Sequence, residues 1–212
     1  CHTLNPRLTA EQLAAMIVQS QARLLIASAD LAPLARKIMD AAPGVERLLV
    51  IDGEAAEGEA LAPLIAVAKP DAVWGRFEET APSGLCFTSG TTGAPKGVTY
   101  THRSNYLHTL RALQVDVMAI SSADAVLAVV PMFHANAWGL PFAAPAVGAK
   151  LVLPGRNADG ASLARLIAAE GVTVGVGVPT VWLGLVEHLE TTGERLSSLK
   201  RIMVGGAPMP PA

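Results

Sequence analysis

The first half of the chain alternates helical and extended hydrophobic patterns. Thr9 and Gln12 form the two ends of a capping box before one amphipathic segment, and Asp30 is placed to cap a second. A short apolar run typical of a strand follows each segment, and the run at 47–51 is continuous, as in a strand buried on both faces. We predict helices at 10–20, 31–42 and 61–68, and strands at 23–27 and 47–51. This order predicts a parallel sheet with right-handed crossovers.

The second half repeats the pattern after an irregular stretch. Residues 69–83 show no clear period, so we place a subdomain boundary there. We predict strands at 84–87, 98–101, 125–130, 150–153, 172–176 and 201–204, and helices at 104–118, 137–147, 162–169 and 180–189. The fold class that follows is α/β, with mostly parallel sheets flanked by helices.

Composition and net charge narrow the range of functions that the chain could have. Of the 212 residues, 51% are apolar and 16% are charged, so we expect a sizeable core. A net charge of −2 argues against a general nucleic-acid or anionic-membrane surface. Two cysteines make no disulfide framework, which indicates a reducing, cytoplasmic setting. Residues 125–149 carry no charge, but Pro131, Pro141 and Pro145 interrupt them, which argues against a transmembrane segment.

The most distinctive segment lies between the strands predicted at 84–87 and 98–101. It gathers residues that suit a polyphosphate, namely Thr88, Ser89, Gly90, Thr91, Thr92, Gly93, Lys96 and Gly97. Glycines let backbone amides approach an anion, hydroxyls donate hydrogen bonds, and Lys96 adds positive charge. Pro95 stands where a Walker A loop needs glycine, and the chain has no GxGxxG dinucleotide pattern. The alternative is a flexible surface linker, which seldom lies between buried strands.

Two further segments follow predicted strands and would lie at one edge of a parallel sheet. Residues 131–134 follow one strand, and Gly205, Gly206 and Ala207 follow another. Ligands of open α/β sheets bind beyond the carboxyl ends of the strands. We therefore expect these segments and the phosphate loop to converge on one crevice.

Four motifs carry a family resemblance that covers essentially the whole chain. Residues 88–97 resemble the signature phosphate loop of the acyl-adenylate-forming superfamily, and residues 129–138 resemble a second signature of its fatty acyl-CoA synthetase branch. Residues 177–182 and 204–208 follow in the expected order. The resemblance implies that residues 1–212 are part of the AMP-binding N-terminal domain of an acyl-CoA synthetase. The later signatures, including the catalytic lysine of the C-terminal domain, are absent from the chain, so we expect residues 1–212 alone to be inactive.

The resemblance implies an AMP-forming fatty acid–CoA ligase that uses ATP, Mg²⁺ and coenzyme A. A medium- or long-chain fatty acid would first become an acyl-adenylate and then an acyl-CoA. For the full-length enzyme the resemblance leaves a homodimer open. Two alternatives remain: a ligase for aromatic or amino acids, and a non-catalytic module that binds a nucleotide or an acyl group.

The resemblance also implies roles for individual residues. His134 would lie near the reacting carboxylate and α-phosphate; its alternative is an ordinary loop histidine. Trp138, Val178 and Thr180 would line the acyl site, although core packing is the usual role of such a tryptophan. The nucleotide would lie against the phosphate-loop residues and against Gly205, Gly206 and Ala207, whose alternative is a plain tight turn. The remaining histidines have no metal-ligand spacing, so we expect no protein-built zinc site.

Overall fold

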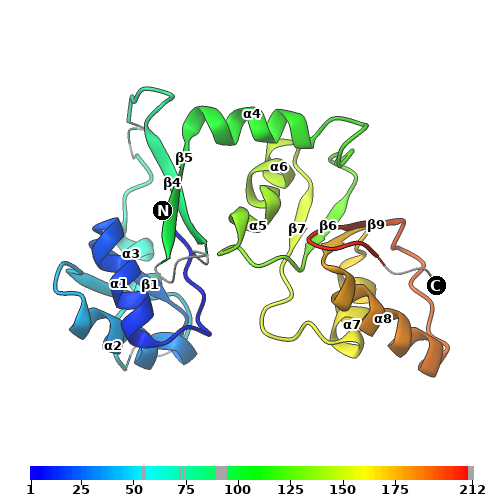
Figure 1. Cartoon of the computed structure of the whole chain (residues 1–212), viewed down its shortest axis with the longest axis horizontal. Coiled ribbons are helices and arrows are strands. Elements are labelled where there is room, and N and C mark those ends of the chain that lie inside the picture. Colours follow the sequence, from blue (N-terminus) through cyan, green and yellow to red (C-terminus); the bar gives the residue numbers. More distant parts are fainter. Residues whose placement is uncertain (54–55, 72, 74, 89–94, 210–212) are drawn as a thin grey trace. The chain divides into compact units, whose positions relative to one another are not determined.

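The apolar runs fold into strands and most amphipathic segments into helices in a computed structural model (Figure 1), which describes residues 1–53, 56–71, 73, 75–88 and 95–209. The strands are β1 (Leu24–Ala27), β2 (Arg47–Val50), β3 (Glu59–Ala60), β4 (Pro82–Thr88), β5 (Lys96–Thr101), β6 (Ala125–Ala128), β7 (Lys150–Val152), β8 (Val174–Gly177) and β9 (Arg201–Val204). The helices are α1 (Ala10–Ser20), α2 (Ala32–Ala41), α3 (Leu61–Val67), α4 (His102–Ala112), α5 (Ala135–Trp138), α6 (Leu140–Ala146), α7 (Gly160–Glu170) and α8 (Pro179–Thr192).

The chain divides into two units. The N-terminal unit comprises His2–Glu78 and Phe87–Val98, and the C-terminal unit comprises Cys1, Glu79–Cys86 and Thr99–Ala212. The paired strands β4 and β5 each contribute residues to both units. One division follows Glu78, inside the range 69–83 where the sequence placed a boundary; that these units are domains stays a prediction.

The N-terminal unit is built on the parallel sheet β1-β2-β3. The predicted capping box is present at α1, because the Gln12 amide donates to Thr9 Oγ1 at 3.3 Å and the Thr9 amide donates to Gln12 Oε1 at 3.0 Å. Helix α1 thereby presents Leu13 and Ile17 to a core that it shares with Leu25 and Leu48 of the sheet and with α2.

The Asp30 cap is wrong. Asp30 lies within a 3₁₀ turn, η1 (Ala29–Leu31). Helix α2 begins at Ala32, and its N-cap residue, Leu31, makes no side-chain hydrogen bond. The turn is held instead by Asp52, whose Oδ1 accepts a hydrogen bond from the Ala29 amide at 2.7 Å.

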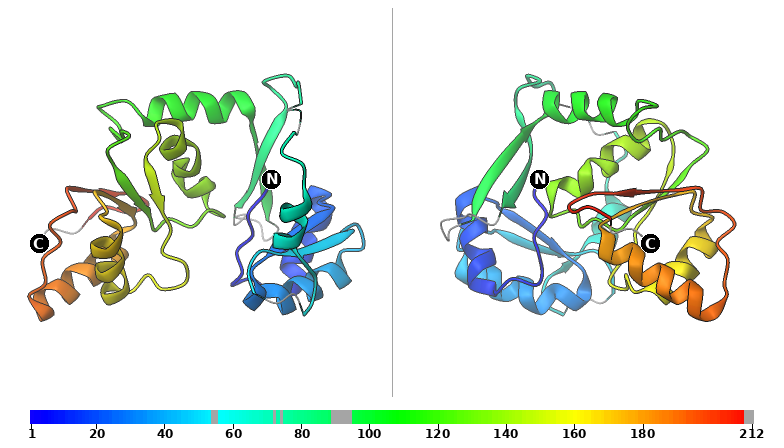
Figure 2. Two further views of the ribbon diagram at one scale, coloured as in Figure 1. Left: turned by 180° about the vertical axis from the view of Figure 1, so that it is seen from behind. Right: turned by 45° about the vertical axis from the view of Figure 1, so that its right-hand side comes forward.

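The C-terminal unit is built on a parallel sheet of order β7-β6-β8-β9. Successive side chains of a strand point to opposite faces, so the side chains of this sheet pack into two separate cores. Val174 and Val176 of β8 face a core shared with α6, whereas Gly175 and Gly177 leave room for the indole of Trp182 on the other face. Helices α7 and α8 pack side by side on that second face (Figure 2). The predicted fold class, parallel sheets flanked by helices, is confirmed.

Two predicted helices differ from the structure, and the two-residue strand β3 was not among the strands that the sequence predicted. Helix α4 begins at His102 and ends at Ala112 rather than spanning 104–118, because the Met118 amide donates to Ala112 O at 3.0 Å and turns Leu113 and Met118 onto the core. The helix expected at 137–147 is shortened to α6 by a left-handed turn before it. No described helix is long and apolar enough to cross a membrane.

Candidate functional site

The loops after β6 and β8 emerge side by side from the C-terminal sheet. The chain runs from β6 to β7 on one side of the sheet and from β8 to β9 on the other, so the strand order reverses between β6 and β8. The carboxyl end of such a pair is the usual place for a ligand in an open α/β sheet. Residues 131–134 follow β6, Val178 follows β8, and Gly205 follows β9. The two segments of the C-terminal unit that we expected at one sheet edge, residues 131–134 and 205–207, therefore follow strands that end at the same edge. That the phosphate loop joins them stays a prediction.

Trp138 lies against the backbone that follows β9. A methyl group built on Gly205 would come within 2.6 Å of Trp138 Cη2, and one built on Gly206 would come within 3.4 Å of Val178 Cγ1. The half-buried indole therefore needs glycine at position 205. This arrangement joins two of the residues predicted for the acyl group to two of those predicted for the nucleotide.

The segment that carries Trp138 is a left-handed turn, residues 135–139. Its φ angles are 45° at Ala135, 50° at Asn136, 48° at Ala137, 55° at Trp138 and 78° at Gly139. Each L-residue in this region costs roughly 1–2 kcal/mol, with glycine and asparagine as the usual exceptions. Backbone strain of this kind persists only where the surrounding structure imposes it.

Contacts on several sides hold the left-handed turn. The Ala137 amide donates to His134 O and the Gly139 amide to Asn136 O, both at 3.0 Å. Ala137 is fully buried, and a methyl group at Gly139 would lie 2.6 Å from two ring atoms of His108 in α4. The Cys86 thiol of β4 donates to Asn136 Oδ1 at 3.0 Å. Each of these contacts lies within the C-terminal unit.

His134, Thr180 and Ala207 lie on the exposed surface of the same unit. The His134 amide donates to Pro131 O at 3.0 Å, which fixes its backbone after β6. Its imidazole makes no hydrogen bond or ion pair within the described part of the chain. Thr180 lies in the first turn of α8, directly after Pro179. These three residues are therefore accessible to a ligand, without a fixed side-chain partner that would reveal a role.

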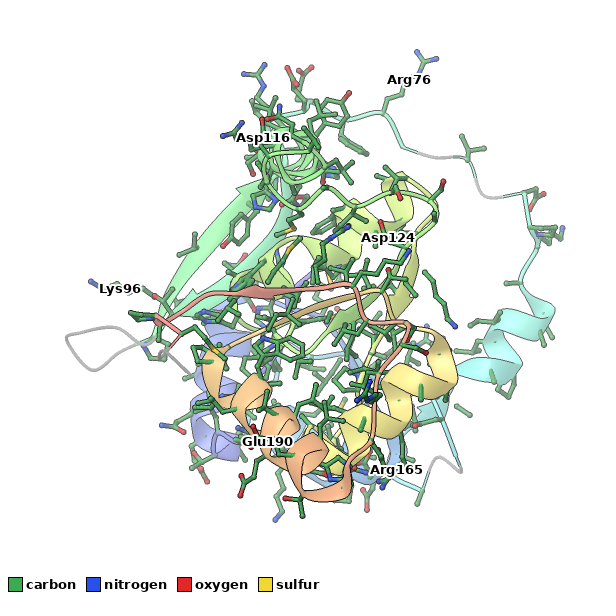
Figure 3. The ribbon with its side chains drawn as sticks, turned by 90° about the vertical axis from the view of Figure 1, so that its right-hand side faces the viewer. Arg76, Lys96, Asp116, Asp124, Arg165 and Glu190 are labelled. Atoms are coloured by element: carbon green, nitrogen blue, oxygen red, sulfur yellow. The ribbon has the colours of Figure 1, made fainter. Side chains whose placement is uncertain are left out.

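The described ends of the predicted phosphate loop are Thr88 and Lys96, both exposed residues of the N-terminal unit. Thr88 Oγ1 donates to Lys96 O at 3.4 Å, so one hydroxyl contacts the backbone of its own loop. The Lys96 side chain extends outward at the start of β5 (Figure 3), and no described residue pairs with its ammonium. Gly97 is exposed and lies with Lys96 in β5 rather than in a loop. The remaining predicted loop residues lie outside the described part of the chain, namely Ser89, Gly90, Thr91, Thr92 and Gly93.

A cluster of polar and charged side chains around Asp124 lies at the opposite end of the sheet from the candidate site. Asp124, labelled in Figure 3, lies just before β6 and is 9% exposed. It accepts hydrogen bonds from Ser121, Thr173 and Arg201. Burial alone would raise the pKa of Asp124, but the hydrogen bonds and the Arg201 charge outweigh it and lower the pKa. Within the described ranges, no three His, Cys, Asp or Glu side chains gather as a metal site would require.

Sequence reasoning missed the residues that support Trp138. It assigned no role to Asn136, Gly139 or His108, and it counted Cys86 only as one of two cysteines that make no disulfide framework. A usable signal was present, because asparagine and glycine are the residue types that most readily adopt positive φ. The spacing of Asn136 and Gly139 around Trp138 is therefore a mark of a left-handed turn that the helical interpretation overlooked.

Comparison with known proteins identifies the family that this chain matches. The model of the AMP-binding enzyme family matches residues 1–212. A long-chain-fatty-acid–CoA ligase of Thermus thermophilus is 46% identical over 99% of this chain and 38% of its own length. A medium-chain-fatty-acid–CoA ligase of Ectopseudomonas oleovorans is 42% identical over 99% and 40%. A 3-methylmercaptopropionyl-CoA ligase of Ruegeria lacuscaerulensis is 42% identical over 100% and 41%.

A solved structure shows the same fold. The N-terminal domain of FACL13 from Mycobacterium tuberculosis superposes with a TM-score of 0.83 and 26% identity, covering 98% of this chain and 50% of that domain. The chain spans about two fifths of the length of the curated relatives that it matches. The family match and the fold extend over both units of the chain.

Proposed function

The chain belongs to the AMP-binding enzyme family, and on that premise we propose that the full-length protein is an AMP-forming fatty acid–CoA ligase. Its proposed substrates are a medium- or long-chain fatty acid, ATP and coenzyme A. The relatives named for long- and medium-chain fatty acids support this class of acid. The observation that carries the proposal is the apolar contact of Trp138 and Val178 with the glycines after β9.

In the proposed first step, a carboxylate oxygen of the fatty acid attacks the α-phosphorus of ATP. The bond to pyrophosphate breaks, and an acyl-adenylate remains. We assign Lys96 to the phosphates of ATP, where one charge-assisted hydrogen bond contributes about 1.5–3 kcal/mol. Ser89, Gly90, Thr91, Thr92 and Gly93 keep the phosphate-loop role that the sequence predicts.

Residues of the C-terminal unit would receive the acyl-adenylate. We assign Trp138, Val178 and Thr180 to the acyl chain, and Gly205, Gly206 and Ala207 to the nucleotide, whose flat rings approach backbone most closely where no side chain intervenes. His134 would donate a hydrogen bond where negative charge develops, at the carboxylate or α-phosphate. The exposure of His134 and the position of Trp138 over Gly205 support these assignments.

In the proposed second step, the coenzyme A thiolate attacks the acyl carbonyl carbon, and AMP leaves with the oxygen that joined it to the acyl group. No three His, Cys, Asp or Glu side chains gather among the described residues, and we assign no step to Mg²⁺. The expected homodimer and cytoplasmic location stay predictions.

Acid-dependent exchange of pyrophosphate into ATP tests the proposal on the full-length protein. The panel should contain fatty acids from short to long, 3-methylmercaptopropionate, benzoate and amino acids. We expect the fastest exchange with a medium- or long-chain fatty acid, and release of AMP when coenzyme A is added. Pyrophosphate exchange with only an aromatic or amino acid would show that the substrate is not a fatty acid. ATP binding without exchange for any acid would make the protein a binding module.

A further inference from the structure

We propose that Asn136 is a positioning residue for acyl-group recognition. By accepting a hydrogen bond from the Cys86 thiol, it holds the left-handed turn in the conformation that places Trp138 on Gly205. The inference rests on the proposed function for the role of Trp138, and it adds the residues that determine where that side chain lies.

The Asn136 amide lies against one face of β4. Cys86 Sγ is 3.0 Å from Asn136 Oδ1, and a methyl group built on Gly84 would lie 3.8 Å from Asn136 Nδ2. Residues 84 and 86 are two apart in a strand, so they share a face. The thiol is the donor and the amide oxygen the acceptor. Because Cys86 is only 3% exposed, water does not compete freely for this hydrogen bond.

The turn needs such a contact at its centre. Ala135 and Ala137 adopt positive φ without any side-chain polar atom that could stabilise it. Asn136 lies between them, and its side chain makes a hydrogen bond that joins β4 to the middle of the turn. Gly139 and His108 hold the far end, but that contact fixes a residue beyond Trp138 rather than before it. Asn136 thus supports the part of the turn before Trp138, whereas Gly139 supports the part after it.

The contact of Trp138 with Gly205 follows from the turn rather than from the indole alone. A left-handed backbone directs Cα–Cβ bonds differently from a right-handed helix, so relaxing residues 135–137 would turn Trp138 away from Gly205. The acyl surface would then change shape, whereas Lys96 and the phosphate loop belong to the other unit of the chain. The expected signature is an effect on the carboxylic acid that is larger than the effect on ATP.

Four variants of the full-length protein test the inference: Cys86→Ala, Cys86→Ser, Asn136→Ala and Asn136→Gly. Hydrogen exchange of the Ala137 and Gly139 amides reports the turn directly. We expect Cys86→Ala and both Asn136 variants to speed that exchange about three- to tenfold, with no matching change in β8. Cys86→Ser keeps a donor of similar size and should retain slow exchange. Asn136→Gly matters most, because glycine accepts positive φ but lacks the amide.

Kinetics give the second readout, on whichever carboxylic acid the substrate panel identifies. We expect KM for the acid to rise by a similar factor in Cys86→Ala and both Asn136 variants, while KM for ATP stays within about twofold. Cys86→Ser should restore the KM for the acid. Because hydrogen exchange needs no substrate, it decides the positioning role even if the protein activates no fatty acid.

Three results would overturn the inference. Unchanged exchange at the turn in Cys86→Ala and Asn136→Ala would show that the thiol–amide contact does not hold it. Wild-type exchange in Asn136→Gly would show that backbone preference, not the amide, is what matters. Faster exchange throughout the C-terminal unit, or an equal rise in both KM values, would reduce Asn136 to a general structural residue.

Discussion

Gly205 is the residue at which the candidate acyl surface is most sensitive to a single methyl group. In Gly205→Ala the new carbon would meet Trp138 Cη2 at 2.6 Å, so the indole must move. We expect KM for the carboxylic acid to rise about tenfold, because the wall formed by the indole is displaced. Steady-state kinetics with the preferred acid measure this change.

The matched controls separate this clash from other effects. Trp138→Ala removes the ring, so adding Gly205→Ala to that variant should change the KM for the carboxylic acid little further. The two substitutions should therefore show a coupling free energy of about 1 kcal/mol or more. Gly184→Ala in α8 meets no atom within 4 Å and should leave KM unchanged. Additive effects of the Gly205 and Trp138 substitutions would contradict a direct contact.

Lys96 carries the prediction for the phosphate loop. Lys96→Ala removes the positive charge that we assign to the phosphates of ATP, so the rate of pyrophosphate exchange with the preferred carboxylic acid should fall about 10- to 100-fold. Lys96→Arg should retain part of the rate because it keeps the charge. Lys200→Ala, another exposed lysine, serves as the control. Unchanged exchange kinetics in Lys96→Ala would remove Lys96 from this role.

Among the elements, β8 shows how strand period and helix packing depend on one another. Its glycines face Trp182, which is 1% exposed beneath the sheet. In Gly175→Ala the methyl carbon would approach Trp182 Cη2 to 2.4 Å. We expect a loss of roughly 1–3 kcal/mol in the free energy of unfolding, measured by urea unfolding of the full-length protein. Gly184→Ala in α8, where the new methyl group would meet no atom within 4 Å, should not lose stability. An equal loss in both variants would contradict the packing explanation.

The same comparison of elements shows what local sequence could and could not predict. The α1 capping box was predictable because Thr9 and Gln12 contact each other across only three residues. The left-handed turn was predictable only in part. Asn136 and Gly139 favour positive φ, but alanine and tryptophan do not, and the contacts that impose the turn come from β4, α4 and the loop after β9. The early end of α4 depends likewise on a core that the local sequence does not encode.

For the whole molecule, the order of motifs along the chain was sufficient to predict convergence at a sheet edge, but not which residues would touch. Parallel strands place their carboxyl ends together whatever their side chains, so 131–134 and Gly205 were expected as neighbours. The contact between the Trp138 indole and Gly205 depends instead on the tertiary contacts that hold the left-handed turn. The Asp124 cluster was missed for a related reason, since Thr173 and Arg201 lie 49 and 77 residues away in sequence.

Asp124 makes the stability of the molecule depend on pH. Its pKa is lowered in the folded protein, so it stabilises the fold above the unfolded value of about 3.9 and loses that contribution as the pH falls through the folded pKa. Asp124→Asn should therefore be less stable than the parent at neutral pH and should lose less stability on acidification below about pH 4. Urea unfolding of the full-length protein, followed by tryptophan fluorescence across that range, measures both slopes. Asp116→Asn, at an exposed site after α4, should follow the parent curve. Parallel curves for Asp124→Asn and the parent would show that the charge of Asp124, held by Ser121, Thr173 and Arg201, does not stabilise the sheet.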